Sequence, residues 1–61
     1  MDSAVPGISL RFIGVTQTAI KDGSLNNPIT IEGKIVHVRE GDLTIYHGDE
    51  YVFDGMRWIC L

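Results

Sequence analysis

Short alternations of apolar and polar residues organise most of the chain. Five β-favouring runs follow one another after Pro28: ITI, KIVHV, LTIY, EYVFD and RWICL. Alternation over a few residues is the pattern of strands with two distinct faces. An earlier run, ISLRFIGV at residues 8–15, alternates in the same way, with Leu10 and Phe12 opposite Arg11. The pattern predicts five or six strands and no helix of normal length.

Turn-forming residues separate the runs. They are Glu32-Gly33, Glu40-Gly41-Asp42, Gly48-Asp49 and Asp54-Gly55-Met56. Tight turns join antiparallel neighbours, because parallel strands need a long crossover. We therefore expect an all-β fold, a small antiparallel meander curled into a barrel or half-sandwich, with residues 8–15 pairing at an edge. Residues 22–28 are dense in turn formers and are expected to form an exposed loop.

Both faces of the predicted C-terminal strands carry apolar side chains. Alternation places Ile35, Tyr46, Tyr51, Phe53 and Ile59 in one set, and Val36, Val38, Leu43, Ile45, Val52 and Trp58 in the other. A short chain covers one set by curling, and the other is left as an apolar patch larger than soluble monomers usually tolerate. The predicted interface consists of Tyr46, Tyr51, Phe53 and Ile59. Trp58 is expected in the core, and Gly41, Asp42, Gly48, Asp54 and Gly55 in structural turns.

Length and cysteine content favour one small domain that gains stability by association. The 61 residues, 44% of them hydrophobic, fit a single β domain over 1–61, with 1–7 as a flexible N-terminal arm. The one cysteine, Cys60, cannot form an internal disulfide, and with His37 and His47 it falls short of a four-ligand zinc site. A core of this size rarely supplies more than about 3–5 kcal/mol, so self-association is expected.

The charge distribution argues against nucleic acid and membrane partners. The net charge is −3, and the five basic residues are scattered along the chain. Nucleic-acid binding usually needs a clustered positive surface. No segment is apolar enough for a signal peptide or a membrane span. We expect a chain that is synthesised in a cytoplasm and contacts neither nucleic acid nor a membrane.

Candidate catalytic and metal-binding residues lack a matching arrangement. The turn acids Glu40, Asp42, Asp49, Glu50 and Asp54 do not have the spacing of a calcium loop. No nucleophile elbow, metalloprotease helix, phosphate loop or dinucleotide fingerprint accompanies His37 and His47. The sequence therefore predicts a protein that is not an enzyme and holds no cofactor or metal.

The stretch GDLTIYHGDEYVFDGMRWICL resembles a module found near the ends of bacteriophage structural proteins, including tail, baseplate and fibre-associated components. The shared signature is Gly-Asp, an apolar strand, Glu-Tyr-Val-aromatic, Asp or Asn, Gly, two variable residues and Trp. It falls here on Gly41, Asp42, Glu50, Tyr51, Val52, Phe53, Asp54, Gly55 and Trp58. Residues 16–35, with the core NPITI, are also similar to segments that precede this signature.

This resemblance implies a virion structural or attachment module, or a decoration protein, made in the host cytoplasm. Such a module would self-associate and dock on a larger phage component. Analogy with phage fibres favours a trimer. The alternative is a small phage-encoded inhibitor or regulator, which would capture a soluble host protein and would not copurify with particles.

Overall fold

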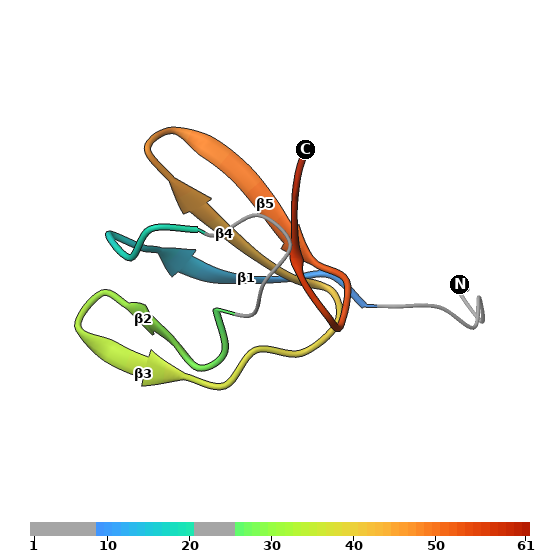
Figure 1. The fold of residues 1–61 in the computed structure, drawn as a ribbon, viewed down its shortest axis with the longest axis horizontal. Helices are drawn as coiled ribbons and strands as arrows, with labels where there is room; N and C mark the ends of the chain where they lie inside the picture. The colour runs from blue at the N-terminus through green and yellow to red at the C-terminus, as the bar shows by residue number, and fades with distance from the viewer. Residues whose placement is uncertain (1–8, 21–25) are drawn as a thin grey trace.

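A computed structural model describes residues 9–20 and 26–61, and these fold into β-strands without a helix (Figure 1). The strands are β1 (Arg11–Val15), β2 (Ile29–Ile31), β3 (Lys34–Val36), β4 (Asp42–Tyr46), β5 (Asp49–Phe53) and β6 (Trp58–Cys60). The predicted all-β class is confirmed. The predicted arm at 1–7 and residues 22–25 of the predicted loop lie outside the described residues.

The main sheet has the strand order β1-β4-β5-β6, with β4, β5 and β6 joined as antiparallel hairpins. His47 and Gly48 form the β4–β5 turn with φ of 51° and 82°, the paired positive values of a type I′ turn. In the β5–β6 turn, Asp54 Oδ1 accepts the N–H groups of Met56 and Arg57 at 2.7 Å each. Local turn chemistry thus accounts for three of the four strands of the main sheet.

β1 joins the main sheet at an edge, as expected, but it runs parallel to β4. The parallel pairing needs a crossover, and the crossover contains β2 and β3. These two strands pair only with each other, as a separate small sheet that lies beside β1 in Figure 1. The predicted uninterrupted antiparallel meander is therefore wrong. The described strands do not close into a barrel.

Side-chain hydrogen bonds hold the small sheet in place. Asn27 bonds the backbone of Val38 twice, accepting its N–H at 3.0 Å and donating to its carbonyl at 3.2 Å. The buried Thr16 hydroxyl, just beyond β1, donates to the carbonyl of Thr30. β2 is thereby fixed against one face of the main sheet, with Ile29 and Ile31 buried.

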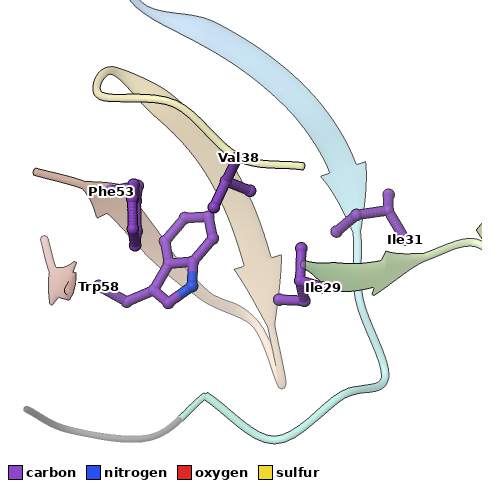
Figure 2. Packing of buried hydrophobic residues seen from close by; sticks show 5 residues of the cluster. All are labelled: Ile29, Ile31, Val38, Phe53 and Trp58. Carbon is purple, nitrogen blue, oxygen red and sulfur yellow. The ribbon is translucent and has the colours of Figure 1, made fainter. Parts of the chain in front are cut away.

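The hydrophobic core lies between β2 and that inner face of the main sheet (Figure 2). Its buried members are Ile29, Ile31, Val38, Phe53 and Trp58. The rings of Phe53 and Trp58 are 5.2 Å apart between centroids and tilted by 59°. The predicted burial of Trp58 is confirmed, since the residue is 2% exposed. The opposite side of the main sheet is called the outer face below.

Candidate docking surface

The β5–β6 register corrects the predicted division of side chains between the two faces. Phe53 pairs directly with Trp58, so both project to the inner face, and Val52 pairs with Ile59 on the outer face. Phe53 is 2% exposed, so its predicted place on an exposed interface is wrong. The physical reason is that the turn at residues 54–57 aligns Phe53 with Trp58, whereas alternation within each strand cannot set this alignment.

The other predicted interface residues divide between the two faces. Tyr51 shares the inner face with Phe53 and packs against the core, and Tyr46 is half-buried on the same face. Burial raises the pKa of the Tyr51 phenol, and Cys60 and Asp49 nearby raise it further. Of the predicted set, only Ile59 lies on the outer face, where it is 39% exposed.

An apolar row crosses the outer face on one level. Phe12 pairs with Leu43, Leu43 pairs with Val52, and Val52 pairs with Ile59. Directly opposite residues project to the same side of a sheet, so the row spans all of its strands. Phe12 is 54% exposed, and Leu43 and Val52 are half-buried.

Further apolar residues extend this row toward both ends of the strands. Ile45 and Val15 pair with each other on the outer face, and Val15 is 39% exposed. Leu10 and Leu61 follow by alternation from Phe12 and Ile59, and they are 66% and 68% exposed. The result is a continuous apolar surface, with no described segment packed over it as β2 is packed over the inner face.

Two charged side chains flank the apolar row. Glu50 pairs with Ile45 in β5 and lies two residues before Val52, while Arg57 lies two residues before Ile59. Because β5 and β6 are antiparallel, these two positions lie at opposite ends of the outer face. Both residues are exposed. Asp54, which is exposed and lies two residues after Val52, is opposite Arg57 at that end. The surface therefore has an acidic side chain at one end and a pair of opposite charges at the other, on either side of an apolar middle.

The predicted turn residue Asp42 is a buried ion-pair partner at the β1–β4 junction. Its carboxylate accepts hydrogen bonds from Nε and Nη2 of Arg11, at 3.0 and 2.7 Å. It also accepts the backbone N–H of Arg39 at 2.9 Å. Burial by itself would raise the pKa of Asp42, but these bonds from Arg11 and Arg39 lower it overall. The pair lies beside an open depression of about 310 Å³ that Ser9 and Glu40 also line. Both carboxylate oxygens of Asp42 are thus engaged in holding β1 to β4.

Other predicted structural residues adopt the expected backbone geometry. Gly41 is buried with φ of 95°, and its N–H donates to the carbonyl of Phe53 at 2.8 Å. Gly55 has φ of 102°, the positive value expected for the turn after Asp54. These positions build the scaffold under the outer face.

The groups considered for metal binding or catalysis are dispersed. Among the described residues, no cluster of three or more His, Cys, Asp and Glu side chains is placed to hold a metal ion. His47 lies in the β4–β5 turn with its ring 4.2 Å from that of Tyr46, and Cys60 is exposed in β6. Residues 9–20 and 26–61 also contain no helix long and apolar enough to cross a membrane.

The sequence pattern alone did not identify Phe12, Val52, Glu50 and Arg57 as parts of one surface. Alternation of Leu10 and Phe12 against Arg11 was a visible signal, but it did not show which strand would lie beside β1. The surface emerges only when the parallel β1–β4 register is known.

Comparison with protein-family models yields no match, and neither curated proteins nor solved structures show significant similarity to the chain.

Proposed function

We propose that the chain is a non-catalytic docking module that assembles into a larger particle through its outer face. The observation that carries this proposal is the bare apolar row formed by Phe12, Leu43, Val52 and Ile59. Exposed contiguous apolar surface is costly in water and marks sites of protein association. The module works as a half-sandwich, in which the small sheet covers the inner face and a partner covers the outer one.

The resemblance to phage structural proteins supports a virion as the larger assembly. Its signature residues Asp54, Gly55 and Trp58 belong to the β5–β6 hairpin, and the outer side of this hairpin carries Ile59. A module of this kind needs no pocket, because a flat apolar sheet binds by shape and buried area. In this proposal the signature residues build the scaffold, and attachment is the activity.

The test is incorporation into purified particles. Mass spectrometry of particles from producing cells should detect the chain, and Ile59→Lys should remove it by placing a charge on the outer face. Ile35→Lys is the matched control, because Ile35 is 73% exposed but lies in β3, away from that face.

Two outcomes would contradict the proposal. One is a wild-type chain that is produced and folded but absent from particles. The other is recovery in a stoichiometric complex with a soluble host protein, which would favour the inhibitor or regulator instead.

A further inference from the structure

We propose that β6 pairs with β6 of a second copy of this chain, as antiparallel neighbours about a two-fold axis at Ile59, so that the two main sheets join into one. The inference concerns the edge of the main sheet and not its outer face, so it is independent of the proposed function. A strand added at a free edge is held by main-chain hydrogen bonds.

The two edges of the main sheet differ. At the β1 edge, the N–H of Val15 donates to the Glu32 carboxylate at 3.3 Å, and β2 lies beside the strand. At the β6 edge, no described residue forms a hydrogen bond with the backbone of Trp58 or Cys60 on the side away from β5. Within the described residues, β6 is therefore the edge at which the main sheet can be extended.

The β5–β6 ladder determines which backbone groups face this free side. The N–H of Leu61 donates to the carbonyl of Glu50 at 2.9 Å, which makes these two residues a hydrogen-bonded pair. Bonded and non-bonded pairs alternate along an antiparallel ladder. Ile59 is therefore bonded to β5 as well, whereas Trp58 and Cys60 direct their N–H and carbonyl groups away from it. Both outward residues offer a donor and an acceptor.

One register of self-pairing uses all of these groups. With Ile59 on the axis, Trp58 of each copy lies opposite Cys60 of the other, and each such pair exchanges two hydrogen bonds. A shift by two residues would place Trp58 against Trp58 or Cys60 against Cys60 and leave the remaining outward residues without a partner in β6. The central register also sets the large Trp58 side chain beside the small, exposed Cys60.

The side chains of β6 do not oppose this pairing. The strand reads WIC, with no charge, no proline and no bulge in its pairing with β5, and these are the features that usually protect a sheet edge. An unprotected edge of this kind is a template for another strand.

The charges that flank β6 are compatible with the two-fold axis. On the outer face, Leu61 would lie between Glu50 of its own copy and Arg57 of the second copy, with Asp54 of the second copy beyond that arginine. Charges of opposite sign are thus the nearer ones. Glu50 is three strand spacings, about 14 Å, from Asp54 of the second copy, which exceeds the screening length of about 8 Å at physiological salt.

The free edge of the small sheet offers less than β6. Its two-residue turn, Glu32-Gly33, has φ of 50° and 83°, so the flanking Ile31 and Lys34 form a bonded pair. By alternation, only Ile35 directs its backbone groups outward from β3. Lys34 beside it is a charged residue of the type that discourages strand addition. The larger number of free groups and the absence of charge favour β6.

The pairing is two-fold, which differs from the threefold symmetry that the phage resemblance implies. Each copy contributes the same short strand, so the contact is isologous. Because Ile59 lies on the axis, the apolar rows of the two outer faces meet at the same level and form one longer row. Strands of three residues bury little area, so the dimer should be reversible.

Sedimentation equilibrium with a proline variant tests the pairing. The wild type, kept reduced so that Cys60 thiols cannot cross-link copies, should show a reversible monomer–dimer equilibrium. Cys60→Pro removes an outward N–H and no bond to β5, so it should stay folded by circular dichroism. It should weaken dimerisation about tenfold or more, because the donor is lost twice in the symmetric contact.

Two variants serve as matched controls. Cys60→Val keeps the N–H and should dimerise like the wild type. Ile35→Pro removes the corresponding outward N–H from β3 and should also leave dimerisation unchanged.

Hydrogen exchange on the wild type gives a second test that needs no variant. The amides of Trp58 and Cys60 should exchange fast in dilute solution and slow down as the dimer forms, whereas the Ile59 amide, bonded to β5, should be protected at every concentration.

Three outcomes overturn the pairing. They are a wild type that is monomeric throughout, a dimer in which exchange at Trp58 and Cys60 does not depend on concentration, and a folded Cys60→Pro chain that dimerises like Cys60→Val. A monomer that still enters particles overturns only this inference. A dimer with the expected exchange pattern that never enters particles supports the pairing and removes the proposed function.

Discussion

Gly14 shows how one residue permits the close approach of two sheets. It lies at the bulge in β1 with φ of 121°, and its carbonyl accepts the buried Thr44 hydroxyl at 2.7 Å. A Cβ at this position would come within 2.6 Å of Ile31 Cγ2 and 2.9 Å of Glu32 Oε2. The absence of a side chain at Gly14 therefore allows β2 to pack on β1, while the Gly14 carbonyl still accepts the Thr44 hydroxyl within the main sheet.

We expect Gly14→Ala to lower the free energy of unfolding by about 2–4 kcal/mol. Backbone strain at positive φ and overpacking against Ile31 each contribute roughly 1–3 kcal/mol. Gly48→Ala is the control, because Gly48 has φ of 82° but no atom within 4 Å of the place that a methyl group would take. It should cost only the strain, about 1 kcal/mol. Urea unfolding measures both, and equal losses would show that the contact with β2 is unimportant.

Asp42 gives stability a defined pH dependence. Its folded pKa is lowered, so its contribution is fully present above the unfolded pKa of about 3.9 and is lost as pH falls through the lower folded value. Asp42→Asn should lower stability at pH 7 by roughly 1–3 kcal/mol, because bonds to a charged acceptor are lost.

The same substitution should flatten the decline of stability below about pH 4. Asp54 also has a lowered pKa, through N–H bonds from Arg57 and Met56, so some acid dependence should remain. Unfolding curves at about pH 7 and about pH 3 for the wild type and Asp42→Asn provide the measurement. An unchanged difference between the two pH values would show that Asp42 is not the titrating group.

At the scale of elements, the positions of strands were predictable but their partners were not. β2, β4 and β5 lie within a residue or two of the runs ITI, LTIY and EYVFD, because alternation and turn residues are local signals. The parallel pairing of β1 with β4 joins segments that no local signal connects. The same limit applied to the candidate site, since assigning Phe53 and Ile59 to faces required the β5–β6 register.

β6 is a short edge strand that depends on Trp58 for its attachment. The indole is buried against Phe53, and its Nε1 donates to the carbonyl of Asn26 at 3.4 Å. Trp58→Ala should unfold the isolated chain, because truncating a buried Trp costs about 3–5 kcal/mol, as much as a core of this size supplies.

Trp58→Phe is the matched variant for this prediction. It keeps an aromatic ring against Phe53 and loses the bond to Asn26, so it should stay folded with a lower melting temperature. Circular dichroism distinguishes the two variants. A Trp58→Ala chain that melts like the wild type would contradict the assignment of Trp58 to the core.

At the scale of the whole molecule, one face of the main sheet is used for folding and the other is left for association. The small sheet covers only the inner face, through Ile29 and Ile31. The lone thiol of Cys60 provides no internal cross-link. A thin core and a bare apolar face are explained together if a partner on the outer face supplies buried area that one chain cannot.

Two phenylalanines on opposite faces separate folding from association. The sequence pattern points to Phe53 as the surface residue, whereas the structure gives this role to Phe12, which is 54% exposed against 2% for Phe53. Phe53→Ser should unfold the chain, because loss of a buried aromatic ring costs about 3–5 kcal/mol. Phe12→Ser should change stability by about 0.5 kcal/mol or less, yet lower incorporation into particles, because Phe12 belongs to the bare apolar row of the outer face. Circular dichroism and mass spectrometry of purified particles measure the two effects for both variants. A folded Phe53→Ser chain, or a Phe12→Ser chain that enters particles like the wild type, would show that the two faces have been assigned the wrong way round.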